Sequence, residues 1–408
     1  MRPKNTYQAS MRSESFTTII SPATAGDASA SAHICVYVQN MAGAVHAIDR
    51  LASDATVAEL KHRLHAIDAD CVVSRSRLML MTEPSSDGDA AHTVLADGAR
   101  TLASYGIVDA TTLHSFVEPR TPGEHVRTIG SGKAGKEVGE FDSPIGVCMS
   151  RDGELVYVVE QSNHRVQELR FVDGAHVRTF EADLSNPRSL CLSPDGVFLF
   201  VSDTGHNCIK VLRIADGKLE RTIGSKESLN APYGVRITPN GAVLWACSNS
   251  GSCVQVFSVA SGDVLHTIDG VDKPIEVCFS RAGDVAYVSD LKNDCVRVFR
   301  TADCVHLLEI GKPGSGAADL KSPWGVCLSA DDSLLYVGDC GNHRVQVFST
   351  TDGAHVHTIG AGVAVSGSST KLAPNGRLHH PMGVCIAPDC ETLLAVSYSG
   401  MRVEVFHS

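Results

Sequence analysis

The sequence predicts a mainly β protein in which a small α+β domain precedes a β-propeller of six blades. Three observations predict this architecture. Six units that open with a proline recur beyond residue 121, and each contains four short β-favouring runs separated by polar turns, as propeller blades do. The segment before them combines strands with one amphipathic helix. The opening prolines are Pro144, Pro187, Pro232, Pro274, Pro323 and Pro381.

Composition excludes several classes of function. The chain of 408 residues has a formal net charge of −11, which disfavours nucleic acid and acidic lipid as partners. No apolar run is long enough to cross a membrane. The 14 cysteines include no C-x2-C pair, which argues against zinc modules such as a RING. No secretory signal is recognisable. We therefore expect reduced thiols, no cofactor and a cytoplasmic location, with nucleus and mitochondrion left open.

The N-terminal part divides in two. Residues 1–32 are rich in Ser, Thr and Ala, which predicts a disordered leader. Residues 33–118 predict a folded domain that begins with two strands around a turn at 41–43. The stretch "SDATVAELKHRLHAI" predicts a helix capped by Ser53 or Asp54, and "SRLMLM" predicts a further strand. The apolar helix face consists of Val57, Leu60, Leu64 and Ile67.

The end of this domain resembles ubiquitin-like (β-grasp) proteins. The matching residues are Asp97, Gly98, Thr101, Leu102, Tyr105, Ile107, Thr112, Leu113 and His114. The domain ends in "VEPRTPG" rather than in Gly-Gly, so the resemblance implies an embedded module and not a conjugated modifier. It also implies an apolar recognition patch at Met41, Met79 and Phe116, which would dock to ubiquitin–proteasome machinery. The alternative is that these side chains belong to the small domain's own core or face the propeller.

The repeats predict a propeller over residues 119–408. The sixth unit stops after its third strand, "MRVEVFHS". The missing fourth strand is predicted at 123–130, because "GEHVRTIG" matches "GAHVHTIG" at 353–360. A strand borrowed from the front would close the ring and remove its open sheet edges.

Units one and five resemble the NHL repeat. Their strings "SNHRVQEL" and "GNHRVQVF" carry the Asn-His pair, with Arg165 and Arg344 in place of Leu. The resemblance implies a substrate-recognition module like those of tripartite-motif ubiquitin ligases, although this chain has no RING. Some NHL propellers bind RNA, so the resemblance also implies RNA binding as an alternative function of the propeller.

A P-loop-like stretch lies between the small domain and the first blade. Gly130 and Gly135-Lys136 have its spacing, but Glu137 stands where a P-loop has Ser or Thr. A strand rather than a helix is expected to follow, so no helix N-terminus would hold the phosphates. We interpret the stretch as an inter-blade loop.

Two repeated sets of residues resemble metal ligands. Five inner strands carry a cysteine where the third carries Arg236, and four second strands end in a carboxylate. Because such positions follow one another around the ring, we expect the thiols to pack between blades and the carboxylates to satisfy turn amides. The cysteines are Cys148, Cys191, Cys278, Cys327 and Cys385. The carboxylates are Glu160, Asp203, Asp290 and Asp339, with Ser248 and Ser397 in the other two units.

The residues that break the repeat are candidates for binding. They follow each opening proline, near one mouth of the ring, and belong to types enriched at protein interfaces. They are Ile145, Arg188, Tyr233, Ile275, Glu276, Trp324 and Met382. The alternative is that they only plug the channel or pack between blades.

The sequence thus favours a non-catalytic adaptor, whose propeller binds a protein and whose small domain docks to ubiquitin–proteasome components. A substrate-recognition role in a ubiquitin ligase and an RNA-binding propeller remain alternatives. A metal-dependent hydrolase or lyase is the catalytic alternative, prompted by carboxylates and by His379-His380. No nucleophile–base pair stands out from the repeats, so no catalytic residue and no metal ligand is predicted.

Overall fold

The chain forms two compact units, residues 1–120 and 121–408. A computed structural model describes residues 122–180, 182–360, 376–390 and 392–408, together with the backbone of six strands between residues 15 and 117. The two units are described separately. None of the helices in the described ranges is long and apolar enough to span a membrane.

The first unit contains one six-stranded sheet with the order β3-β2-β1-β6-β4-β5. Its strands are β1 (Ser15–Pro22), β2 (His33–Gln39), β3 (Val45–Ala52), β4 (Ser76–Met81), β5 (His92–Val94) and β6 (Thr112–Val117). The antiparallel pair β2–β3 is the predicted hairpin, and β4 is the strand expected from "SRLMLM".

Two predictions for this unit need comment. Strand β1 lies inside segment 1–32, where the sequence indicated no regular structure, and pairs antiparallel with both β2 and β6. Its three large apolar residues, Phe16, Ile19 and Ile20, do not alternate with polar ones, which is why the strand could not be recognised from the sequence pattern. The predicted helix and the turn at 41–43 lie outside the described residues.

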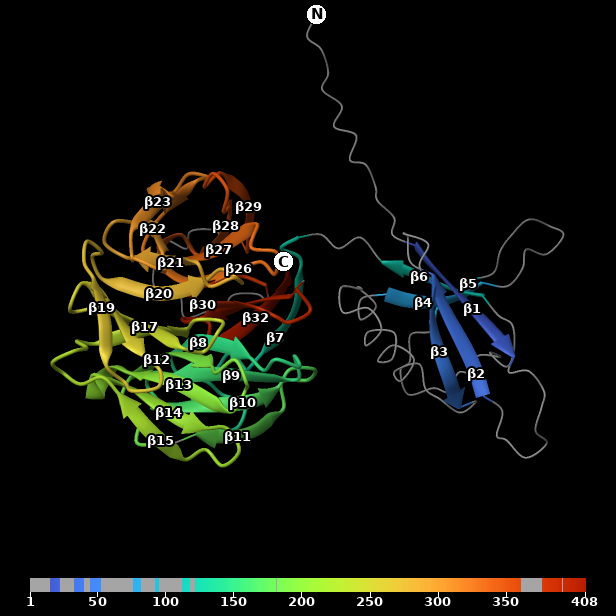
Figure 1. The fold of residues 1–408 in the computed structure, drawn as a ribbon, viewed down its shortest axis with the longest axis horizontal. Coiled ribbons are helices and arrows are strands. Elements are labelled where there is room, and N and C mark those ends of the chain that lie inside the picture. Colours follow the sequence, from blue (N-terminus) through green and yellow to red (C-terminus); the bar gives the residue numbers. More distant parts are fainter. Residues whose placement is uncertain are drawn as a thin grey trace, which may run out of the picture. The chain divides into compact units, whose positions relative to one another are not determined.

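The second unit is a six-bladed propeller, as the repeats predict (Figure 1). Blade one contains β8 (Pro144–Met149), β9 (Leu155–Glu160), β10 (Arg165–Arg170) and β11 (His176–Phe180). Blade two contains β12 (Pro187–Leu192), β13 (Phe198–Asp203), β14 (Cys208–Arg213) and β15 (Leu219–Ile223). Blade three contains β16 (Pro232–Ile237), β17 (Val243–Ser248), β18 (Cys253–Ser258) and β19 (Val264–Ile268).

The other three blades repeat this plan. Blade four contains β20 (Pro274–Phe279), β21 (Val285–Asp290), β22 (Cys295–Arg300) and β23 (His306–Ile310). Blade five contains β26 (Pro323–Leu328), β27 (Leu334–Asp339), β28 (Arg344–Ser349) and β29 (His355–Ile359). Blade six contains β30 (Pro381–Ile386), β31 (Thr392–Ser397), β32 (Arg402–His407) and β7 (His125–Ile129).

Short elements occupy some of the connections. The two-residue strands β24 (Lys312–Pro313) and β25 (Asp319–Leu320) pair in parallel between blades four and five. Single 3-10 turns follow the second strands of blades two and five, namely η3 (Thr204–His206) and η4 (Cys340–Asn342).

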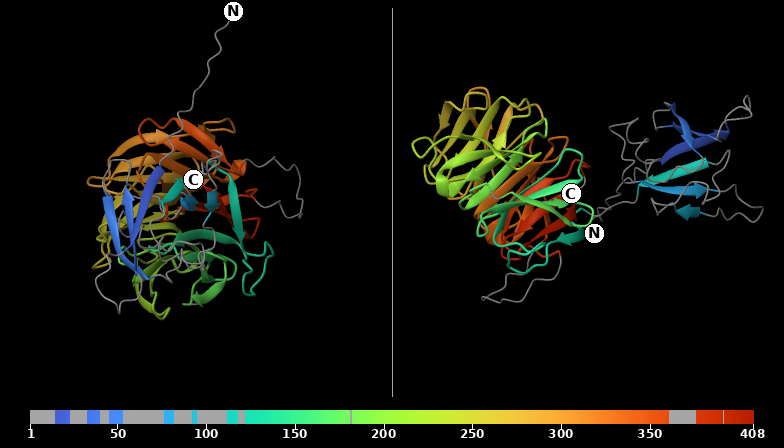
Figure 2. Two further views of the ribbon diagram at one scale, coloured as in Figure 1. Left: turned by 90° about the vertical axis from the view of Figure 1, so that its right-hand side faces the viewer. Right: turned by 90° about the horizontal axis from the view of Figure 1, so that it is seen from below.

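Strand β7 closes the ring. It pairs antiparallel with β32, with Ile129 opposite Val403 and Thr128 opposite Glu404. Figures 1 and 2 show these first and last segments of the propeller in one sheet. The sixth sheet is therefore complete, and β32 has no free edge.

The described residues of the second unit form six apolar clusters, one at each junction between neighbouring blades. The second strands are buried almost throughout, because a blade is covered on both faces by its neighbours. This explains why "LVYVVE" and "FLFVSD" are continuous apolar runs. The fourth strands form the outer edge and expose residues such as Val177 and Val356.

Candidate functional site

The predicted mouth residues come together around the channel axis. All seven line one depression, and they enter it from the first strands of the six blades. Ile145 and Ile275 are buried, whereas the larger side chains are partly exposed. The partly exposed residues are Arg188, Tyr233, Glu276, Trp324 and Met382. The repeat-breaking positions thus form one surface, which we call the mouth surface.

The mouth is almost closed. The cavity among these side chains has a volume of about 10 Å³, which is room for one water molecule at most. Glycines allow the inner strands to approach closely at this level. A Cβ at Gly325 would lie 2.3 Å from the backbone oxygen of Met382, and one at Gly383 would lie 2.5 Å from that of Ile145. A drug-sized ligand needs several hundred Å³, so the mouth presents a surface and not a pocket.

An aromatic and cationic group dominates this surface. The Arg188 guanidinium lies 4.0 Å from the centre of the Tyr233 ring, and the rings of Tyr233 and Trp324 are 5.9 Å apart. Arg188 makes no hydrogen bond or ion pair with any described residue, and its Nε atom is buried without a partner. Burial lowers the pKa of Arg188, although the nearby Tyr233 and Tyr398 act in the opposite direction.

Glu276 differs from the other mouth residues because its carboxylate accepts hydrogen bonds inside the channel. Ser189 Oγ, two blades away, donates to Glu276 Oε2 at 2.7 Å, and the amide of Val277 donates to Oε1 at 3.2 Å. Burial raises the pKa of Glu276, against the effect of Arg236. The carboxylate therefore links blade four to blade two and passes next to Gly234 of blade three, where a side chain would collide with it.

The strand-end carboxylates satisfy backbone amides, as the turn interpretation predicts. In every blade, the last side chain of the second strand accepts a hydrogen bond at 2.7 to 3.1 Å from an amide located 18 residues earlier. Each of the four carboxylates also forms an ion pair within its blade. The pairs are Glu160–Arg165, Asp203–Lys210, Asp290–Arg297 and Asp339–Arg344.

Serine replaces the carboxylate where no such cation is available. Blade three has Cys253 and Gln255 on the facing strand, and in blade six Arg402 is paired with Glu404. A buried carboxylate would then lack its counter-charge. Among the described residues, no group of three His, Cys, Asp or Glu side chains is arranged to hold a metal ion.

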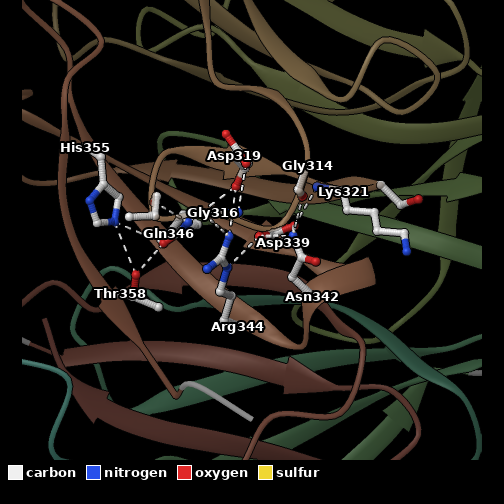
Figure 3. Close-up of polar contacts among 12 residues, drawn as sticks. Gly314, Gly316, Asp319, Lys321, Asp339, Asn342, Arg344, Gln346, His355 and Thr358 are labelled. Carbon is white, nitrogen blue, oxygen red and sulfur yellow. Dashed lines mark hydrogen bonds and ion pairs between the residues drawn. The ribbon is translucent and has the colours of Figure 1, made fainter. Parts of the chain in front are cut away.

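The Asn-His-Arg motif holds loops in place (Figure 3). In blade five, Asn342 Nδ2 donates to Asp339 and to the backbone oxygen of Gly314, while Arg344 donates to Asp339 and to the backbone oxygens of Gly316 and Asp319. Blade one repeats this with Asn163, Arg165 and the loop 135–140. The motif therefore anchors the Gly-rich loop that enters its own blade.

The P-loop-like stretch is this anchored loop. Its backbone oxygens at Gly135 and Lys136 accept from Asn163 and Arg165. The amides of Ser131 and Gly135 donate to the backbone oxygens of Gly139 and Phe141. Strand β8 follows instead of a helix. These amides are therefore not free to surround a phosphate.

The cysteines pack as predicted, with one addition. Each of the five lies in a cluster between two blades, and every cysteine in the described ranges is a free thiol. Burial raises the pKa of Cys191 and of Cys278 to about 12. Three of these thiols, together with Arg236, also line a second cavity. The sequence indicated this cavity only through the arginine that replaces the cysteine in the third blade.

The predicted patch of the small domain is described only in part. Met79 lies in β4 and Phe116 in β6, and the register pairs them with His114 and Arg77 respectively. Met41 lies outside the described residues. The recognition role of these three residues stays a prediction.

Two family models match segments of the propeller. A model of the NHL repeat family matches residues 320–348, which contain blade five up to its third strand. A model of the SMP-30/Gluconolactonase/LRE-like region matches residues 169–292. No curated protein matches the chain. A solved chain of Kuenenia stuttgartiensis hydrazine synthase is 16% identical, with a TM-score of 0.48, and the match covers 68% of this chain and 98% of that one.

Proposed function

We propose that the propeller is a non-catalytic interaction module that binds a protein partner on its mouth surface. Tyr, Trp, Arg and Met are the types enriched at the centres of protein interfaces. Here all four are partly exposed on the first strands of their blades, and Arg188, Tyr233 and Trp324 lie against one another. A closed mouth suits a broad contact rather than a small substrate.

One observation carries this proposal. Arg188 is held over Tyr233 without a hydrogen bond or ion pair to any other described residue, in a chain that is strongly acidic overall. A half-buried guanidinium without a counter-charge is costly in isolation. A partner that brings a carboxylate or a backbone oxygen to Arg188 would recover that cost on binding.

Cross-linking in cells followed by mass spectrometry tests the proposal. Wild type is compared with Trp324→Ala and with the outer-edge control Val356→Ala, which lies far from the mouth along the blade. We expect at least one partner to be lost with Trp324→Ala and kept with Val356→Ala. Identical partner sets for all three proteins would contradict a binding role for the mouth surface.

The match to the SMP-30/Gluconolactonase/LRE-like region favours a metal-dependent hydrolase as second candidate. The residues present fit it less well, because the strand-end carboxylates are already bound to amides and basic side chains. Elemental analysis of the purified chain separates the two candidates. Stoichiometric calcium or zinc would favour the hydrolase, and its absence after metal-supplemented purification would favour the adaptor.

We further propose that the small domain docks to ubiquitin–proteasome components through Met41, Met79 and Phe116. The support is the ubiquitin-like sequence ending and the position of Met79 and Phe116 on the paired strands β4 and β6. Met79→Asp should remove these components from the recovered partners and leave those of the propeller. Recovery of the same components with Met79→Asp would contradict the docking patch.

A further inference from the structure

A second cavity lies at the other end of the inner strands. The mouth surface is formed by their second and third residues, whereas this cavity is lined mainly by the fifth and sixth residues of the inner strands of blades three to six. Its volume is about 250 Å³. We call it the lower chamber. Its lining residues are Arg236, Ile237, Pro239, Cys278, Phe279, Cys327, Leu328, Val384, Cys385 and Ile386.

Arg236 is the one charged residue among these lining side chains. Its Nε atom donates to the backbone oxygen of Val277 at 3.3 Å, which fixes the side chain on the neighbouring blade. Its Nη1 and Nη2 atoms make no hydrogen bond within the described ranges, and no ion pair joins Arg236 to Glu276 there. The outer edge of the guanidinium is therefore available to a ligand.

The repeat makes this arginine unusual. The same strand position holds a cysteine in the other five blades, so a thiol fits the packing there. Placing a guanidinium in surroundings of thiols and apolar side chains costs free energy unless a counter-charge satisfies it. Burial acts to lower the pKa of Arg236, but Glu276 raises it above its usual value, so Glu276 supplies a counter-charge. The Glu276 oxygens are held by Ser189 and by the amide of Val277, so the guanidinium still lacks hydrogen-bond partners at its outer edge.

The lining defines the ligand by its chemistry. One guanidinium can hold a carboxylate through two parallel hydrogen bonds, while the apolar walls favour a short apolar body. Thiols are weak donors and cannot replace the hydration shell of a phosphate. We propose that the lower chamber binds a small organic monocarboxylate, with its carboxylate on Arg236 and its apolar part against Phe279, Leu328 and Ile386.

Thermal unfolding of the full chain with benzoate or hexanoate tests the site, and benzamide serves as the uncharged control. Wild type should show a saturable rise in Tm with both carboxylates and none with benzamide. Arg236→Cys, which installs the residue of the other five blades, should abolish the rise. The surface variant Arg300→Gln should keep it, because Arg300 is exposed and paired with Asp303.

A second variant separates loss of the ligand from loss of the fold. The pair Arg236→Cys and Glu276→Gly gives both positions the residues of the repeat and leaves no buried carboxylate alone. This protein should fold and should still fail to respond to benzoate. A rise in Tm that survives in the double variant, or a wild type that does not respond, would overturn the proposal.

Alkylation gives an independent readout. Cys278, Cys327 and Cys385 line the chamber, whereas Cys390 is exposed elsewhere. Benzoate should slow modification of the three chamber thiols by N-ethylmaleimide, measured by peptide mass spectrometry, and should leave Cys390 unaffected. Equal rates with benzoate and benzamide would contradict binding in the chamber. Because the mouth surface takes no part, this result is independent of the protein-binding proposal.

Discussion

The Nδ1 atom of His343 accepts a hydrogen bond from the backbone amide of His380 at 3.2 Å, so that blade five holds the entry of blade six. His164 does the same for Asn186 at 3.0 Å, between blades one and two. Both histidines adopt a left-handed backbone, with φ of 55° and 57°. The histidine of the NHL-like motif is therefore a link between blades.

This link predicts a pH dependence of stability. The pKa of His343 is lowered by burial and by the neighbouring His380, His379 and Lys321, so the folded state favours the neutral ring. Its contribution is present above the unfolded pKa of about 6.5 and is lost as pH falls below that value. Protonation also removes the lone pair that accepts from His380.

His343→Asn should make Tm less sensitive to pH. Asn207 holds the same position in blade two, with φ of 56°, and its Oδ1 accepts from the amide of Ala231 at 2.8 Å. We expect a smaller fall in Tm between pH 7.5 and pH 5.5 than in wild type, measured by calorimetry. An unchanged fall would show that other groups set the acid sensitivity.

The carboxylate at the end of β27 should be essential for stability. Asp339 is fully buried and accepts from the amide of Lys321 and from Arg344. Asp339→Ala leaves the Arg344 guanidinium without its counter-charge, which typically costs about 3–5 kcal/mol. Urea denaturation measures the loss. Glu220→Ala breaks the exposed pair with Arg213 and should change nothing measurable, so equal losses would refute this explanation.

Arg236 and Glu276 should be energetically coupled. Each single replacement, Arg236→Cys or Glu276→Gly, leaves one charged group in the channel without the other. The double variant removes both charges, so its loss of unfolding free energy should be smaller than the sum of the two single losses. A double-mutant cycle by chemical denaturation measures the coupling. Additive losses would mean that the two charges do not interact.

The closing strand should be required for a soluble propeller. A chain of residues 121–408 retains β7, whereas one of residues 131–408 lacks it and exposes the edge of β32. We expect the longer chain to be monomeric with one cooperative transition and the shorter chain to aggregate, as followed by size-exclusion chromatography with light scattering. A stable monomer without β7 would contradict closure by this strand.

Much of the fold could be predicted because each blade repeats the same local chemistry. The prolines at 144 and 381 fix the register of the first and last blades, and the short sixth unit indicates that a strand comes from residues 123–130. The mouth residues could be predicted because they share one register position. That position lies directly after the opening proline, where the first strand of each blade enters the ring, so the residues line one mouth.

Two properties of the site depend on distances that a sequence does not contain. The mouth is closed because Gly325 and Gly383 let neighbouring inner strands approach closely, and only the structure gives that spacing. The opposite end stays open, which leaves Arg236 beside a cavity. Strand β1 was missed because its pattern is weak and because one of its two pairing partners, β6, is distant in sequence.

The affinity of a recovered partner for mouth variants tests the central claim most directly. The account predicts that Trp324→Ala and Arg188→Gln each weaken binding by about 2 kcal/mol or more, roughly 30-fold, in isothermal titration calorimetry, as expected for central interface residues. Val356→Ala, on the outer strand β29, should bind like wild type. Unchanged affinity in both mouth variants would contradict the account. A loss of affinity in Val356→Ala would then place the interface on the outer edge of the propeller.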